Sequence, residues 1–230
     1  MKIESILQVD RQNYTIVSMS LTLDRDASAR GIIAIQASDP ITGTVCLFNG
    51  INGTAKLYFT GYIEQCVRID AKQHRLTVRS IPGKLAKRVH IAMRNSQLLE
   101  ILAALGKSSG VIFRTTGNWT EKSVSHFAAL GTGDDALRQI GELSGIQDWV
   151  TLEQPDGSLY VGSGQDVKRK KTIFRFDEKI FTALSATGAD CAFIPSLRPG
   201  MLMRIGDSPV LEITTITIAA EKMRLGFEYA

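Results

Sequence analysis

The sequence contains few of the residues that form disulfide frameworks or metal sites. Only three cysteines and three histidines occur among its 230 residues. Cys46, Cys66 and Cys191 are odd in number, lie far apart and belong to no C-x-x-C or Cys/His cluster, so we expect reduced, buried thiols. The histidines show no metal-ligand spacing either, and we interpret them as surface or hydrogen-bonded core residues. No metal site and no cofactor is predicted.

Long apolar runs are also lacking. No window approaches the uninterrupted apolar length of a membrane span, and the N-terminal sequence has no apolar signal core. These two features predict a soluble protein with no membrane partner. We expect it to be made in the cytoplasm and to leave it only as part of an assembly.

The chain has no strong excess of charge of one sign. Lys and Arg number 27 against 23 Asp and Glu, which gives a net charge of +4 and a pI near 9.0. The charges are spread along the chain, unlike the dense stripes of nucleic-acid-binding proteins, so no specific nucleic acid is expected. The one basic run is Lys168, Arg169, Lys170 and Lys171, which we interpret as a solvated linker and retain as a candidate interface.

Catalytic motifs are missing as well. Neither Gly131-Thr-Gly133 nor Gly162-Ser-Gly164 extends to a dinucleotide-binding or phosphate-binding glycine motif. Asp134 and Asp135 are adjacent, and adjacent helical positions do not face each other, so their charges favour a helix start over an acid pair. We therefore predict that the chain is not an enzyme.

What the sequence has in quantity is strand-like alternation. From Tyr14 to Leu23, apolar and polar residues alternate with the period of two of an antiparallel strand exposed on one face. A hairpin is predicted from Tyr62–Ile69 and Arg75–Ser80. Further strands are predicted at Gly31–Ile35, Thr44–Phe48 and Lys56–Thr60. Strands of even spacing without a long helix between them indicate a small barrel or sandwich.

The period changes to 3.6 in a central segment. Apolar residues at helical spacing predict a first helix over 98–105, with Asn95 or Ser96 as its N-cap and with Gly106 and Gly110 as its end. A second helix is predicted at 134–144.

Two strand elements complete this segment. A short strand is predicted at Val111–Phe113, and Trp149–Leu152 is predicted to form a hairpin with Leu159–Val161. We favour core packing over base stacking for the large aromatic residues here, Trp119, Trp149 and Tyr160, because they lie outside the predicted barrel strands.

The alternation returns in the last part of the chain. Five more strands are predicted there, at Thr172–Phe176, Ile180–Ser185, Met201–Ile205, Val210–Ala219 and Met223–Tyr229. The fold class is thus α+β, mainly β, with two small β-barrel-like regions flanking an inserted α/β module. The predicted domains are an N-terminal β-barrel-like domain (1–92), an α/β insertion module (93–171) and a second β-barrel-like domain (172–230).

Arg198 is a further candidate interface residue. It is followed directly by Pro199 and Gly200 just before a predicted strand, so its position is fixed by a turn. An interface anchor and an ordinary β-turn residue explain this sequence equally well.

Four segments in order carry a resemblance to a known family. They are Ile81–Arg88, His126–Gly133, Gln154–Gly162 and Ile194–Gly200. Together they resemble the tail hub proteins of contractile-tailed bacteriophages, the late-control and baseplate-hub family, with its Mu-like prophage relatives and its relatives in phage-like injection machines.

The resemblance implies a structural adaptor. In that family two small barrels flank an α/β insertion, and three subunits form a ring that joins the sixfold tail tube to the threefold central spike. The implied partners are further copies of the chain, a tube protein and a spike protein. The implied location is the virion tail, or baseplate, after assembly in the host bacterial cytoplasm. The chain stops at Ala230, so an extra C-terminal domain of longer members is expected to be absent, and spike attachment is left open.

A binding module is the alternative of a different class. Small barrels and a basic pI also suit an oligonucleotide- or oligosaccharide-binding β-barrel module. A ring without affinity for nucleic acid favours the hub, whereas a monomer with salt-sensitive binding favours the module.

Overall fold

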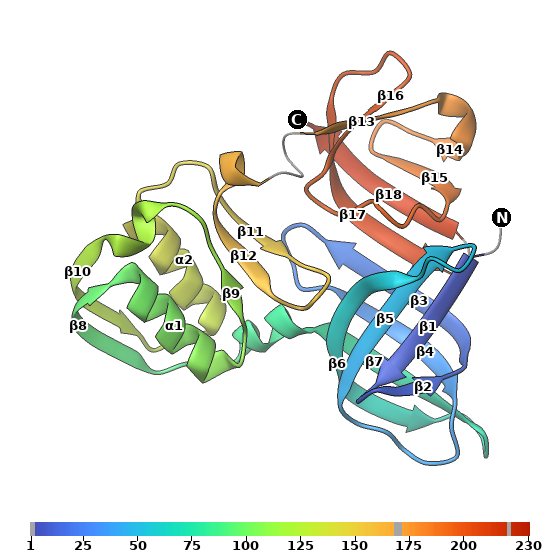
Figure 1. The fold of residues 1–230 in the computed structure, drawn as a ribbon, viewed down its shortest axis with the longest axis horizontal. Helices are drawn as coiled ribbons and strands as arrows, with labels where there is room; N and C mark the ends of the chain where they lie inside the picture. Colours follow the sequence, from blue (N-terminus) through green and yellow to red (C-terminus); the bar gives the residue numbers. More distant parts are fainter. Residues whose placement is uncertain (1–2, 168–171, 220–221) are drawn as a thin grey trace. The chain divides into compact units, whose positions relative to one another are not determined.

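The computed structural model describes residues 3–167, 172–219 and 222–230, which fold into two compact units (Figure 1). The first, the β unit, combines the chain up to Ser80 with the chain after Val167. The second, the α/β unit, is Ile81–Val167. The division into three domains at 1–92, 93–171 and 172–230 stays a prediction.

The β unit is built from strands of both ends of the chain. Its N-terminal strands are β1 (Ile3–Val9), β2 (Gln12–Tyr14), β3 (Ile16–Asp24), β4 (Arg30–Gln36), β5 (Thr44–Ile51), β6 (Lys56–Arg68) and β7 (Gln73–Ser80). Its C-terminal strands are β13 (Ile173–Phe176), β14 (Phe181–Leu184), β15 (Gly188–Ala192), β16 (Leu202–Ile205), β17 (Leu211–Ala219) and β18 (Lys222–Tyr229), with a 3-10 turn at Glu178–Ile180. The mainly-β character predicted from the alternation is confirmed.

These thirteen strands form one sheet. Its order is β14-β15-β18-β17-β3-β4-β7-β6-β5-β1-β2, and every neighbouring pair along it is antiparallel. Strand β16 pairs with β17 and carries β13 in parallel on its other side. Among the described residues the pairings do not close into a ring, although Thr15 alone separates β2 from β3. The barrel-like form of the two regions therefore stays a prediction.

Strand β17 joins the two ends of the chain. Its residues 215–219 pair with residues 20–24 of β3, while Leu211 and Glu212 pair with β16. Inward-facing residues on both sides of this joint, such as Leu21, Ile216 and Leu225, are fully buried in one continuous core. Each such side chain stabilises the fold by about 1.5–3 kcal/mol, so the two β regions share their stability.

The α/β unit has its own core. Its helices are α1 (Leu98–Ser109) and α2 (Gly133–Ser144), and its strands are β8 (Ile91–Gln97), β9 (Phe113–Arg114), β10 (Ser123–Ala129), β11 (Trp149–Glu153) and β12 (Leu159–Ser163). Short 3-10 turns lie at Ile81–Ala86, Asn118–Glu121 and Gly164–Asp166. Strand β8 pairs with β10, and β12 pairs with β11 and β9. Buried faces of α1 and α2, including Leu98, Ile101 and Ile140, share this core with residues of both sheets.

Several local predictions were wrong. Asn95 and Ser96 do not cap α1 but lie in β8, and the N-cap is Gln97, whose backbone N–H donates to the Glu100 carboxylate at 2.9 Å. Gly106 lies inside α1 and does not end it; a Cβ atom there would lie 3.0 Å from the Val111 carbonyl oxygen of the next segment. Gly110, with φ of 74°, ends the helix as predicted.

The strand boundaries also differ. The predicted strands 56–60 and 62–69 are one strand, β6, whose partner register shifts at a bulge between Ile63 and Gln65. The strand predicted at 111–113 is Phe113–Arg114 instead. The predictions did not include β1, β2, β8, β10 and β15.

Candidate interaction surfaces

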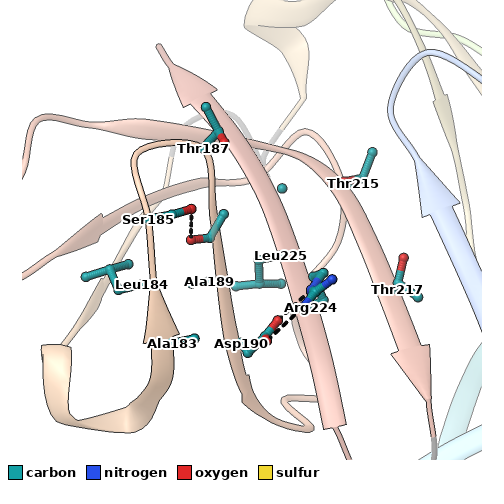
Figure 2. A pocket seen from close by; sticks show the side chains of 12 residues that line it. Ala183, Leu184, Ser185, Thr187, Ala189, Asp190, Thr215, Thr217, Arg224 and Leu225 are labelled. Atoms are coloured by element: carbon teal, nitrogen blue, oxygen red, sulfur yellow. Dashed lines mark hydrogen bonds and ion pairs between the residues drawn. The ribbon is translucent and has the colours of Figure 1, made fainter.

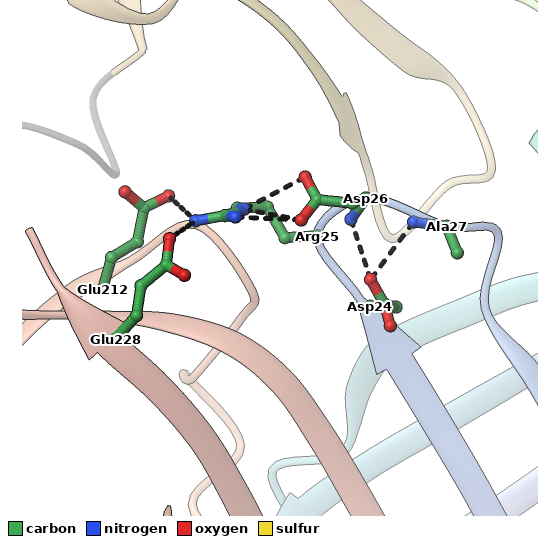
Figure 3. Close-up of polar contacts among 6 residues, drawn as sticks. All are labelled: Asp24, Arg25, Asp26, Ala27, Glu212 and Glu228. Atoms are coloured by element: carbon green, nitrogen blue, oxygen red, sulfur yellow. Dashed lines mark hydrogen bonds and ion pairs between the residues drawn. The ribbon is translucent and has the colours of Figure 1, made fainter. Parts of the chain in front are cut away.

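Arg25 holds the end of β3 against the C-terminal strands (Figure 3). Its guanidinium lies 2.6 Å from Glu228 on β18, 3.4 Å from Glu212 on β17 and 2.9 Å from Asp26. Its backbone N–H donates to the Thr214 carbonyl at 2.8 Å. The hydrogen bond to Asp26, and then that to Glu228, raises the pKa of Arg25 above its ordinary value although burial lowers it. The charge is therefore permanent and ties the two ends of the chain together.

The turn after Arg25 is fixed from within. The Asp24 carboxylate accepts hydrogen bonds from the backbone N–H groups of Asp26 and Ala27, at 2.8 and 3.2 Å (Figure 3). This is an Asx turn, which orders the β3–β4 connection without help from neighbouring strands.

Arg198 is engaged within the β unit. Its guanidinium carbon lies 3.6 Å from the centroid of the Tyr58 ring, and Phe193 meets the same ring edge-on at 5.6 Å. Tyr58 lies in β6 and is almost fully buried, which raises its pKa to about 12 although the Arg198 charge lowers it. Arg198 thus links the β15–β16 loop to the N-terminal strands by a cation–π contact. Its role between subunits stays a prediction.

The other predicted interface residues, Lys168, Arg169, Lys170 and Lys171, lie outside the described residues. Their role also stays a prediction.

A hollow of about 460 Å³ opens on the outer face of strands β14, β15, β17 and β18 (Figure 2). Gly188 and Gly226 pair directly across two of these strands, and a Cβ atom on Gly188 would lie 2.9 Å from the Leu225 carbonyl oxygen. A Cβ atom on Gly226 would collide with the Thr215 hydroxyl. The hydroxyls of Ser185 and Thr187 also border the hollow, which suits a polar side chain of a partner.

The ion pair of Arg224 and Asp190 lies beside this hollow. Arg224 donates to both carboxylate oxygens of Asp190, at 2.7 and 3.0 Å, and this holds the pKa of Asp190 below its ordinary value (Figure 2). The two-point contact fixes the direction of the guanidinium on an exposed face.

The sheet has open strand edges. In the part of the chain that the structure describes, β14 pairs only with β15, and β13 pairs only with β16. Ile173, Ile180 and Leu184 lie on or next to these edge strands and are 41–49% exposed. Open edges with exposed apolar side chains are suitable for contact with another chain.

The candidates for chemistry have structural roles. Asp135, the third residue of α2, accepts hydrogen bonds from the hydroxyl and backbone N–H of the N-cap Thr132, at 2.7 and 3.2 Å, and so completes a capping box at the helix start. Trp119 packs edge-on against Trp149 at 5.1 Å, which agrees with the prediction of core packing. His74 is 1% exposed and lies 3.1 Å from the Ala37 carbonyl through Nδ1.

The three cysteines are free. No group of three or more His, Cys, Asp or Glu side chains in the described residues is placed to hold a metal ion. Over the same residues, no helix has the length and apolar character needed to cross a membrane.

The sequence is similar to that of a phage protein. No family model matches the chain. An uncharacterised 58.7 kDa protein of Haemophilus phage HP1 is 20% identical over 228 residues, which are 98% of this chain and 43% of that protein. The chain therefore spans less than half the length of the curated relative that it matches.

Solved structures match over nearly the whole chain. The 43 kDa tail protein of prophage MuSo2 from Shewanella oneidensis has a TM-score of 0.74 at 11% identity, covering 99% of this chain and 97% of that one. The E. coli c3393 protein, a type VI secretion component with structural similarity to T4 tail proteins gp27 and gp5, has a TM-score of 0.64 at 10% identity, covering 97% and 76%. The chain thus has the fold of phage tail proteins, and the resemblance found in the sequence is confirmed at the level of the fold.

The sequence-based reasoning missed the hollow and the Arg25 cluster. A glycine inside a strand pattern often marks a bulge or a close approach, and Gly226 within the predicted strand 223–229 was such a signal. No sequence signal marked Arg25, because its partners Glu212 and Glu228 lie about two hundred positions away in the chain.

Proposed function

We propose that the chain is a structural hub or tail-tip subunit of a phage or phage-like contractile injection machine. Three copies form a ring that adapts the tail tube to the central spike, and the chain performs no catalysis. The observation that carries this proposal is the structural match to a prophage tail protein, which covers 99% of this chain and 97% of that one.

The construction of the β unit supports a ring. One sheet runs through both β regions, so the subunit presents a broad continuous β surface to its neighbours. The edge strands β13 and β14 carry exposed apolar residues, including Ile173 and Leu184, that a neighbouring subunit would cover. The barrel-like form of the two regions is part of the proposal, and the short step from β2 to β3 across Thr15 supports it for the N-terminal region.

The proposed partners follow from the relatives. The E. coli protein is a type VI secretion component that resembles T4 proteins gp27 and gp5, and another structural match is a PdpA-VgrG complex of Francisella. For this chain we infer a tube protein on one side of the ring and a spike protein on the other. The assembled location is the virion tail, after assembly in the bacterial cytoplasm.

Electron microscopy of the purified chain tests the ring. We expect class averages of annular particles with threefold symmetry, either from the chain alone or after mixing with its tube protein. Averages that show only single subunits in both samples would remove this proposal.

A further inference from the structure

Helices α1 and α2 cover one face of the β8–β10 pair in the α/β unit (Figure 1). The side chains of Ile91, Phe127 and Ala129 on that face are buried in the core that the strands share with the helices. Because successive side chains of a strand point to opposite faces, the exposed positions that alternate with them lie on the outer face.

The antiparallel register fixes the order of the residues on this outer face. The same register continues past the ends of the two strands to an isolated bridge. The opposed residues are, in order along the face, Arg94 and His126, Ala92 and Ala128, His90 and Leu130, and Arg88 and Thr132. All of these residues except Thr132 are exposed, and we call the exposed ones the β8–β10 strip.

The strip has a guanidinium group at each end and apolar side chains between them. Arg94 and Arg88 are six positions apart, which corresponds to about 20 Å along an extended chain. Ala92, Ala128 and Leu130 lie between these ends, and Leu130 is 72% exposed. An apolar centre with a charged rim is the usual anatomy of a contact surface between proteins.

The polar side chains of the strip have no partner within the part of the chain that the structure describes. The two arginines of the α/β unit outside the strip both pair with carboxylates, whereas Arg88 and Arg94 make no ion pair or side-chain hydrogen bond there. The same holds for the rings of His90 and His126. A guanidinium offers only donors, and a histidine ring offers an N–H in either protonation state. No Asp or Glu belongs to the strip, so acceptors for these donors have to come from another molecule.

The spacing of charged and apolar groups selects the kind of molecule. Carboxylates about 20 Å apart can pair with Arg88 and Arg94, while apolar groups between them cover Leu130. A nucleic acid carries phosphates at short, even intervals, and some of them would lie over the alanines and Leu130, where the strip has no arginine. The pattern therefore favours a protein segment over a nucleic-acid strand.

We propose that the β8–β10 strip is a docking site for a partner protein whose contact segment carries Asp or Glu at both ends and apolar residues between them. The carboxylates pair with Arg88 and Arg94, the histidines add hydrogen bonds, and the apolar middle of the segment covers Leu130. The strip lies in the α/β unit, whereas the proposed ring uses the β unit, so this site goes beyond the proposed function and does not depend on it.

Methyl NMR of the full chain, labelled at alanine and leucine, tests the site. The probe is a peptide of about 10 residues with a pair of glutamates near each end and leucines between them, the acidic pairs about 20 Å apart when extended. A scrambled peptide of the same composition and a short DNA strand of the same total charge are the comparison probes. We expect the patterned peptide to shift the signals of Ala92, Ala128 and Leu130, to leave that of Leu184 on β14 unchanged, and to bind about fivefold more tightly than the scrambled peptide.

Variants separate the strip from general charge. The double variant Arg88→Gln/Arg94→Gln should bind the patterned peptide about fivefold more weakly, the loss expected for two exposed charge pairs. The matched control Lys107→Gln/Arg138→Gln removes the same charge from exposed positions outside the strip and should change the affinity less than about twofold. Leu130→Ser, at a mostly exposed position, should weaken binding of the patterned peptide and leave that of the scrambled peptide unchanged.

Several results would overturn the proposal. Equal losses in the double variant and its control, or equal binding of the two peptides, would mean general electrostatic attraction. Absence of binding, or shifts confined to methyl groups outside the strip, would mean that the strip is not a docking site. Tighter binding of the DNA strand at the strip would assign the face to nucleic acid. A lower mass of the assembled chain in Leu130→Ser, measured by sedimentation, would make the face a contact between copies of the chain; the ring itself is tested separately on the unaltered chain.

Discussion

Two arginines connect the N-terminal strands of the β unit with its C-terminal strands. Arg25 reaches from the β3–β4 turn to Glu212 and Glu228, and Arg198 reaches from the β15–β16 loop to the Tyr58 ring. Both contacts bridge residues that are far apart in the chain. They show how charged groups help to fix the relative position of two β regions whose cores are already continuous.

A pair of variants measures the contribution of Arg198 to this connection. Arg198→Gln should lower the free energy of unfolding by about 1–2 kcal/mol, because it removes a partly desolvated cation–π contact. Tyr58→Phe keeps the ring and should change it by less than about 0.5 kcal/mol, because the Tyr58 hydroxyl has no hydrogen-bond partner among the described residues. Urea denaturation at one protein concentration compares the variants, since subunit association adds to apparent stability.

Measuring the self-association of the same variants by light scattering decides between two roles of Arg198. If Arg198→Gln leaves the stability of the chain unchanged but weakens its self-association, the residue acts between subunits rather than within one. That result would contradict the intramolecular role described above.

At the scale of elements, the edge strands are the features on which the proposed ring depends. Strand β14 ends at Leu184, which is 49% exposed, and β13 begins at Ile173, which is 43% exposed. An unpaired edge in a monomer invites association with another chain unless charges block it. These two strands present apolar side chains there, which suits an edge that is covered in the proposed ring.

Leu184→Glu should therefore weaken the ring without unfolding the subunit. Because a charge at the centre of an apolar contact is poorly tolerated, we expect the concentration at half-dissociation to rise about tenfold or more. The control is Leu130→Glu, since Leu130 is 72% exposed and lies in the α/β unit. Light scattering gives the association, and circular dichroism checks the fold. An unchanged mass for Leu184→Glu would exclude β14 from the subunit contact.

Local patterns predicted some elements well. The alternation at 14–23, the helix at 134–144 and the hairpin of 149–152 with 159–161 all correspond to structure, because their signals lie within a few residues of one another. The cap of α1 was mistaken because β8 continues through Asn95 and Ser96 directly into the helix, so strand pairing overrides the local preference for a cap.

Long-range features were not predictable in the same way. The pairing of β17 with β3 joins residues nearly two hundred positions apart, and nothing in either strand names its partner. The hydrogen bond between the Thr217 and Thr22 hydroxyls arises from this pairing alone, since the two residues become neighbours only when the two ends of the chain meet. The family resemblance supplied the overall arrangement, but it did not supply these side-chain contacts.

The whole molecule combines a β unit built from both chain ends with an α/β unit inserted between them. In the proposed ring the β units make the subunit contacts, because they hold the open edges and the broad sheet. Contacts of this kind are obligate in type and bury on the order of 1,000 Å² or more per partner. A mass of three subunits is therefore expected at modest protein concentration.

Sedimentation in the analytical ultracentrifuge tests this central claim most directly. The chain has a mass of 25.2 kDa, and the account predicts a species of three times that mass in the micromolar range, either alone or with its tube protein. If the chain sediments only as a 25.2 kDa monomer at every concentration, both alone and with the tube protein present, the account is contradicted.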